Sequence, residues 1–152
     1  MSVMDALLSD ANIVLDVDLP SRTALFHVVG ELFERGSGLP ADKVAASLDA
    51  RERIGSTGLG QGVAIPHARM KGLDRALAAF VRTRVPIAFG APDGKPVSDF
   101  LVLLVPSHAT DVHLQILADV AARFDDRAFR EQLRSCTDAA AARALFADWA
   151  PA

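Results

Sequence analysis

The sequence predicts an α/β fold in which a mixed central β-sheet is flanked by helices on both faces. Short apolar strands alternate with amphipathic helices along most of the chain, and two more helices close its C-terminal end, a pattern typical of this fold class. Hydrophobic residues make up 51% of the chain and aromatic residues only 6%, as expected when small aliphatic side chains pack helices on a sheet. No linker or repeat divides the sequence, so residues 1–152 are expected to form a single domain.

The N-terminal part predicts a strand followed by a helix. Residues 12–17 are apolar enough for a short strand. Ser21 is a suitable N-cap for a helix that extends to about Glu34, because apolar residues recur there at spacings of three and four. Gly36 and Gly38 are expected to end this helix.

A second helix and a glycine-rich stretch come next. The helix is expected over residues 40–53, ending at Arg51 or Arg53, with Pro40 in its first turn, where the missing N–H costs nothing. Residues 55–62 contain four glycines and are expected to form a loop that permits positive φ and close backbone approach. The loop leads into a short apolar strand at 63–65.

The second half of the chain predicts two strands and three helices. Residues 76–82 and 98–105 are expected to be strands, and the second is apolar throughout, which suits a central strand covered on both faces. The turn residues at 92–95 favour a hairpin between them. The helices are expected from Asp111 after a Thr110 cap, from an Asp125 or Asp126 cap to about Ser135, and from a Thr137 or Asp138 cap to about Trp149.

Charge and hydropathy exclude several classes of partner. The formal net charge is −3 and no basic cluster exists, so nucleic acid is not expected to bind. The longest apolar run covers residues 100–106, far fewer than the roughly 20 residues that a membrane-spanning helix needs. The single cysteine, Cys136, excludes an internal disulfide and fits a reducing compartment, so we expect a cytoplasmic location without membrane insertion.

His67 is the strongest candidate for chemistry. It follows Pro66 at the end of a predicted strand, where ligand chemistry usually collects in α/β sheets. Pro66 fixes its own φ and keeps Ile65 extended, so the backbone that delivers the ring is stiff. A neutral imidazole is a good nucleophile near pH 7, because its ordinary pKa is about 6.5. The alternative interpretation is a core histidine that bonds to a backbone carbonyl.

Two other residues are candidates for the same site. His113 lies in the first turn of a predicted helix, where it can either share a site with His67 or be a surface residue. Arg51 ends a helix just before the glycine-rich stretch, and a planar guanidinium suits a phosphoryl group. Arg53 and Arg69 compete with Arg51 for that role.

The run from Arg51 to His67 resembles the signature of phosphotransferase-system enzyme IIA domains of the fructose/mannitol type, and in particular their nitrogen-regulatory branch, IIA-Ntr. Segments similar to that branch recur in order and spacing at 83–89, 93–97, 103–106 and 113–118. The resemblance therefore covers nearly the whole chain as one EIIA type-2 domain. Ala68 stands where a glycine often follows the histidine, and it is also small.

The resemblance implies roles for individual residues. His67 would be phosphorylated through Nε2, His113 would orient or hydrogen-bond the phosphoryl group, and Arg51 would stabilise its charge. Ser56 and Thr57 match supporting positions near the site. Phosphoryl transfer of this kind requires the protein mainly to position and neutralise, so we expect neither a cofactor nor a metal.

The resemblance also implies partners. An HPr-like or NPr-like phosphocarrier protein of a bacterial phosphoenolpyruvate-dependent phosphotransferase system would donate the phosphoryl group. In the nitrogen-regulatory branch the phosphorylation state is itself the output, and it is read by regulatory targets of the potassium-transport or sensor-kinase type. The alternative is a sugar-specific IIA component that passes phosphate to a IIB domain, although the chain contains no IIB, IIC or carrier segment.

Two rival hypotheses need no phosphate. The first is a metal-binding module, because His108 and His113 have a spacing that zinc ligands use, with His67 and Cys136 as further ligands. Against it, Cys136 lies near a helix end and is expected to pack. The second is a structural or interaction domain in which His67 has no chemical role. His27, four residues before Glu31, is expected to form a solvated pair on its helix.

Overall fold

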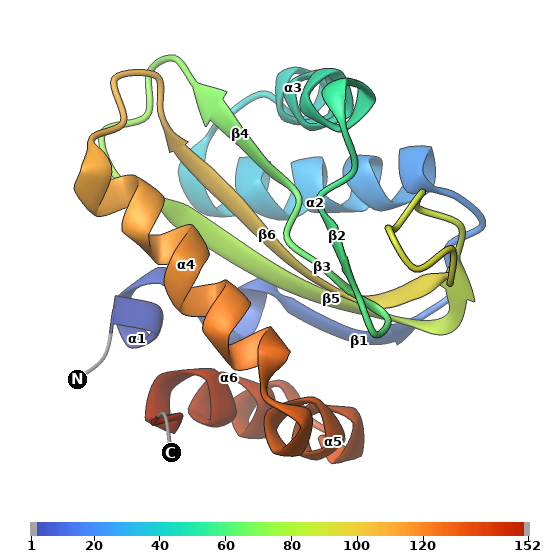
Figure 1. Cartoon of the computed structure of the whole chain (residues 1–152). Coiled ribbons are helices and arrows are strands. Elements are labelled where there is room, and N and C mark those ends of the chain that lie inside the picture. Colours follow the sequence, from blue (N-terminus) through green and yellow to red (C-terminus); the bar gives the residue numbers. More distant parts are fainter. Residues whose placement is uncertain (1–2, 151–152) are drawn as a thin grey trace.

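The computed structural model describes residues 3–150, which form a six-stranded mixed sheet with helices on both faces (Figure 1). The predicted fold class is therefore confirmed. Strands β5 and β6 form an antiparallel hairpin, as the turn residues indicated. Strand β1 lies parallel to β5, and β3 and β4 lie parallel to β6. In spatial order the strands are β1 (Ile13–Val17), β5 (Leu77–Ile87), β6 (Val97–Pro106), β3 (Val63–Ala64) and β2 (Gly58–Gly60), with β4 (His67–Met70) also paired to β6.

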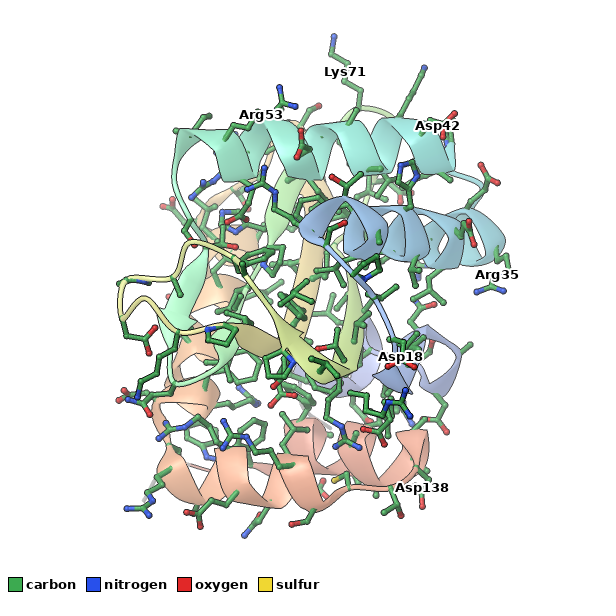
Figure 2. The ribbon with its side chains drawn as sticks, turned by 90° about the vertical axis from the view of Figure 1, so that its right-hand side faces the viewer. Asp18, Arg35, Asp42, Arg53, Lys71 and Asp138 are labelled. Atoms are coloured by element: carbon green, nitrogen blue, oxygen red, sulfur yellow. The ribbon has the colours of Figure 1, made fainter. Side chains whose placement is uncertain are left out.

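Separate sets of helices cover the two faces of the sheet. One face packs against α2 (Arg22–Ser37) and α3 (Ala41–Ile54). The other packs against α1 (Val3–Leu7), α4 (Asp111–Asp125), α5 (Arg127–Ser135) and α6 (Ala139–Asp148), and a short 3-10 turn (Asp10–Asn12) leads into β1. Figure 2 shows these layers, with α3 at the top, the C-terminal helices at the bottom and the sheet between them. No helix within residues 3–150 combines the length and apolar character needed to cross a bilayer.

Strand β6 is the centre of both hydrophobic cores. Its side chains alternate between the two faces, with Phe100 and Val102 in the core under α2 and α3, and Leu101 and Leu103 in the core under α4 to α6. Almost every residue of β6 is buried. This confirms the prediction of a central strand, because only a strand covered on both faces can bury consecutive apolar side chains.

Local capping sets several helix boundaries as predicted. The side chain of Ser21 accepts from the N–H of Ala24, and Asp126 and Asp138 cap α5 and α6 in the same way. Helix α2 extends three residues beyond its predicted end at Glu34. Of the two glycines expected to end it, Gly38 is the C-cap, with φ +77°, and Gly36 still lies within the helix.

The start of α3 differs in detail from the prediction. Pro40 is the N-cap residue rather than part of the first turn. The first free N–H of the helix, that of Ala41, bonds instead to the carboxylate of Glu34 at 2.8 Å. At its other end α3 extends to Ile54, so Arg51 and Arg53 both lie within its last turn.

The glycine-rich stretch 55–62 was predicted entirely as a loop, and this is wrong in its middle. Residues 58–60 form β2, an edge strand antiparallel to β3. Gly58 permits the close approach there, because a Cβ on it would lie 2.9 Å from the Cβ of Ala91. Gly60 and Gly62 have positive φ at the turn that follows. The stretch therefore folds back along β3.

His67 does not lie at the end of a strand, as the sequence predicted, but begins β4. Pairing with β6 stops at Ala64 and resumes at His67, which lies opposite Leu103. Pro66 explains the interruption, because it has no N–H to donate, whereas its carbonyl oxygen accepts from the N–H of Leu103 at 2.9 Å. A second boundary also differs, since the strand predicted at 76–82 extends to Ile87.

Candidate functional site

The ring of His67 is held by the backbone just before it. Its Nδ1 lies 2.9 Å from the carbonyl oxygen of Ile65. A carbonyl can only accept a hydrogen bond, so Nδ1 carries the proton in the neutral ring and Nε2 keeps its lone pair. Nε2 is therefore the ring nitrogen whose lone pair is free to react.

The surroundings of His67 favour its neutral form. Its pKa is lowered from the ordinary value of 6.5, first because burial disfavours the charged imidazolium and then because the Arg51 cation is nearby. The bond to Ile65 and the charge of Glu52 oppose this shift. The ring is consequently uncharged near neutral pH, as a nucleophile must be.

Arg51 and His67 lie on the same two surface hollows. One, of about 370 Å³, is lined by both residues together with Ser56, Thr57 and residues of α4. The other, of about 530 Å³, is lined by both together with further residues of α3, β4 and α4. The guanidinium also donates a 2.8 Å hydrogen bond to the carbonyl of Gly55. The structure thus brings the predicted nucleophile and the predicted cation to one opening.

The other two arginines considered from sequence differ in position. Arg69 lines the larger hollow with His67. Arg53 instead pairs with Asp49 at 2.8 Å on the outer surface of α3, where Figure 2 labels it. Arg51 lines both hollows, which favours it over Arg53 and Arg69 as the partner of a group bound at His67.

Ser56 and Thr57 line the smaller hollow, but their hydroxyl groups already have partners. Ser56 donates to the carbonyl of Phe89 at 3.1 Å and accepts from the N–H of Gly58 at 3.0 Å. Thr57 donates its hydroxyl proton to Glu52 at 2.7 Å. Both side chains therefore shape the glycine-rich stretch instead of presenting free donors to a ligand.

Glu52 is a residue near the site that sequence reasoning missed. Its side chain is only 4% exposed, and its carboxylate accepts from both the N–H and the hydroxyl of Thr57. A signal was present in the sequence. The buried stripe of α3 includes Val44, Ala45 and Leu48, and its spacing continues to position 52, where an acid stands in place of an apolar residue.

His113 lies in the first turn of α4, and its Nδ1 accepts from the N–H of Thr110 at 3.2 Å. This bond leaves Nε2 with the proton, so the ring can donate a hydrogen bond. Within residues 3–150, however, no hydrogen bond joins His113 to His67 or Arg51. The same helix does reach the site, because Leu114 and Leu117 line the larger hollow. The structure brings α4 to His67 but does not join the two rings.

Exposed apolar side chains surround the opening. Ile54 is 84% exposed and Leu114 is 41% exposed, and both line the larger hollow. Leu59, which is 46% exposed, lines the smaller one. Exposed apolar residues of this kind are typical of surfaces that bind another protein, a membrane or a ligand.

The described part of the chain, residues 3–150, contains no group of three or more His, Cys, Asp or Glu side chains placed to hold a metal ion. The sulfur of Cys136 contacts the carbonyl of Gln132 at the end of α5. The proposed metal module of His67, His108, His113 and Cys136 therefore has no support in the geometry.

Comparison with known proteins shows the family of the chain. The family model described as "Phosphoenolpyruvate-dependent sugar phosphotransferase system, EIIA 2" matches residues 6–149. The chain belongs to this EIIA type 2 family. The family description places its members in a phosphotransferase system.

Relatives of the chain include proteins named for nitrogen regulation. The nitrogen regulatory protein of Pseudomonas aeruginosa is 35% identical over 148 residues, covering 95% of each chain. The crystal structure of the nitrogen regulatory protein IIA-Ntr from Neisseria meningitidis is 47% identical and superimposes with a TM-score of 0.91, covering 95% of this chain and 99% of that one. The resemblance to the nitrogen-regulatory branch is thereby confirmed.

The IIA mannitol protein of Escherichia coli shares the fold at lower sequence identity. Its crystal structure superimposes with a TM-score of 0.76 at 20% identity, covering 91% of this chain and 98% of that one. The mixed sheet with helices on both faces is thus common to relatives with different names.

Proposed function

We propose that this chain carries a phosphoryl group on Nε2 of His67 and acts as a regulator through its phosphorylation state. The observation that carries the proposal is the 2.9 Å contact between Nδ1 of His67 and the carbonyl of Ile65, which leaves Nε2 with a lone pair beside hollows shared with Arg51. We also propose that this takes place in the cytoplasm.

The proposed reaction follows from these groups. The lone pair of Nε2 attacks the phosphorus atom, the N–P bond forms, and the bond between phosphorus and the donor breaks as the donor keeps that electron pair. The ring of His67 becomes positive, and the carbonyl of Ile65 stabilises this charge through the Nδ1–H bond. The Arg51 fork neutralises the equatorial oxygens, and the Nε2–H of His113 donates a hydrogen bond to one of them.

The donor we propose is a phosphorylated HPr-like or NPr-like carrier protein. The apolar side chains around the opening, including Ile54 and Leu114, supply a docking surface for it. The names of the relatives support a nitrogen-linked regulatory role, and we propose targets of the potassium-transport or sensor-kinase type. A fructose/mannitol-type transport component would instead pass the group to a IIB domain.

A reconstituted phosphorelay tests the proposal. The protein is incubated with phosphoenolpyruvate, the first enzyme of the system and an NPr-like carrier, and intact mass is measured before and after mild acid. We expect one acid-labile phosphoryl group, absent in His67→Ala and retained in His27→Ala. A label that persists in His67→Ala contradicts the site. Rapid loss of the label to an added IIB domain would favour sugar transport over regulation.

A further inference from the structure

Glu52 has no place in the proposed reaction, yet it is the buried acid nearest in sequence to Arg51. Its side chain is 4% exposed. A carboxylate removed from water is costly unless it accepts hydrogen bonds. Glu52 accepts two, from the backbone N–H of Thr57 at 2.8 Å and from the hydroxyl of Thr57 at 2.7 Å. Both connect α3 to the glycine-rich stretch.

The bonds continue from Thr57 to His67. The carbonyl of Thr57 accepts from the N–H of Ile65 at 3.1 Å. The carbonyl of Ile65 in turn accepts from Nδ1 of His67 at 2.9 Å. On the other side the carbonyl of Pro66 is held by the N–H of Leu103. The peptide units on both sides of the Ile65 carbonyl, which selects the His67 tautomer, are therefore held by hydrogen bonds, and the bond to Thr57 leads on to Glu52.

We propose that Glu52 is a positioning residue for His67: acting through Thr57 and Ile65, it holds the ring in the tautomer that leaves Nε2 free. This inference rests on the proposed function, in which Nε2 is the attacking atom. A neutral histidine side chain in water prefers to carry its proton on Nε2, which would block attack. The fold must therefore favour the other tautomer, and Glu52 anchors the hydrogen-bonded chain that does so.

Glu52 has a second effect that can be separated from the first. Its negative charge raises the pKa of His67, whereas the Arg51 cation lowers it. Glu52→Gln removes the charge but keeps an oxygen that can accept from the N–H of Thr57. Glu52→Ala removes the charge and also the oxygen that accepts from Thr57. Thr57→Val removes only the hydroxyl bond to Glu52, and Thr57→Ser keeps it.

The tautomer can be read without any phosphate donor, from the ¹⁵N–¹H correlations of the His67 ring in the unphosphorylated protein. We expect protonated Nδ1 in the wild type, in Glu52→Gln and in Thr57→Ser, with a lower pKa of His67 in Glu52→Gln. In Glu52→Ala we expect a mixture of tautomers and phosphoryl acceptance slowed by roughly 10- to 100-fold, as when a reacting group loses its alignment. Thr57→Val should shift the tautomer population and the rate of phosphoryl acceptance in the same direction as Glu52→Ala does, but by less.

Glu34→Ala is the matched control, because it breaks a 2.8 Å bond from a glutamate to a backbone N–H at the far end of α3. Glu34→Ala should leave the tautomer of the His67 ring as it is in the wild type. A folded Glu52→Ala protein with the wild-type tautomer overturns the proposal. Should Glu52→Ala fail to fold, identical tautomers in Thr57→Val and Thr57→Ser overturn it equally. If the wild type accepts no phosphate, the proposed function fails, while the role of Glu52 is still decided by the ring spectra.

Discussion

Arg51 donates a 2.8 Å hydrogen bond from Nη1 to the carbonyl of Gly55, so the cation beside His67 also connects the last turn of α3 to the glycine-rich stretch. The guanidinium is thus partly held before any phosphate arrives. A group that needs little reorganisation stabilises developing charge more effectively than a free one.

Replacing Arg51 should affect both the pKa of His67 and the rate of phosphoryl acceptance. Arg51→Ala removes a cation that lowers the His67 pKa, so the pKa should rise while the rate falls roughly 10- to 100-fold. Arg51→Lys keeps the charge without the planar fork and should change mainly the rate. Ring titration and single-turnover kinetics measure the two effects. Arg53→Ala, on the exposed side of α3, is the control, and a loss of rate equal to that of Arg51→Ala would count against the assignment.

The pH dependence of phosphoryl acceptance should follow His67. Burial lowers its pKa below 6.5, so at pH 6.5 a larger fraction of the ring is neutral than in an ordinary histidine. As the pH is lowered, the rate should therefore begin to fall at a lower pH than it would for an ordinary histidine. The contribution of His67 to folding stability also falls with decreasing pH, because the unfolded chain binds this proton more readily than the folded chain below about pH 6.5. An NMR titration of the ring measures the pKa of His67. A midpoint at or above pH 6.5 would show that burial does not lower this pKa.

His113 should contribute through its Nε2 proton. Because Nδ1 accepts from Thr110, His113→Ala removes a donor to the phosphoryl oxygens, and a bond to a charged group of this kind corresponds to roughly 10-fold or more in rate. Single-turnover transfer from the carrier measures it. His108→Ala, in the preceding loop, is the matched control. Unchanged kinetics in His113→Ala would restrict this histidine to capping α4.

Asp99 should make the fold less stable at neutral pH than at mildly acidic pH. Its side chain is 0% exposed, neither carboxylate oxygen has a hydrogen-bond partner within the described residues, and the nearest cation, Nε of Arg134, is 4.0 Å away. Burial raises its pKa from 3.8 to about 6. The folded state therefore binds a proton that the unfolded state releases, so the penalty is fully present above about pH 6 and is lost as the pH falls toward 3.8.

Asp99→Asn should relieve that penalty. We expect the free energy of unfolding at pH 7 to rise by roughly 1–3 kcal/mol, since each pKa unit corresponds to about 1.4 kcal/mol and the amide recovers only part of it. Urea unfolding across the acid range measures this. The exposed Asp148→Asn variant should change stability by less than about 0.5 kcal/mol. A variant that unfolds more easily than wild type at pH 7 refutes the account.

The sequence was most informative where structure depends on local chemistry. Ser21 was identified as a cap, and Asp126 and Asp138 were each one of two adjacent candidates, because a cap bonds to N–H groups two or three residues away. His67 and Arg51 were found through their signature, and the structure places them on shared hollows.

What the sequence did not show depends on distant partners. The short strands β2 and β4 exist only through pairing with β3 and β6, so neither periodicity nor propensity indicates them. Arg82 is a charged residue that is buried because groups far away in the chain accept its hydrogen bonds. It bonds to Asp16 and to the carbonyls of Leu133 and Cys136 at the end of α5. Burial of such residues follows from the fold and cannot be read from composition.

Two glycines of α2 should respond in opposite ways to alanine. A Cβ on Gly30 would lie 2.5 Å from the carbonyl oxygen of Ala41, where α2 meets α3, whereas nothing lies within 4 Å of a Cβ on Gly36. Gly30→Ala should therefore separate the helices and destabilise the fold by roughly 1–3 kcal/mol. Gly36→Ala should stabilise it by up to about 1 kcal/mol, since alanine loses less backbone entropy in a helix. Thermal unfolding compares the two. Because α3 also carries Arg51 and Glu52, Gly30→Ala should slow phosphoryl acceptance as well, and a Gly30→Ala protein as stable and active as Gly36→Ala would mean that the spacing of α2 and α3 does not matter to the site.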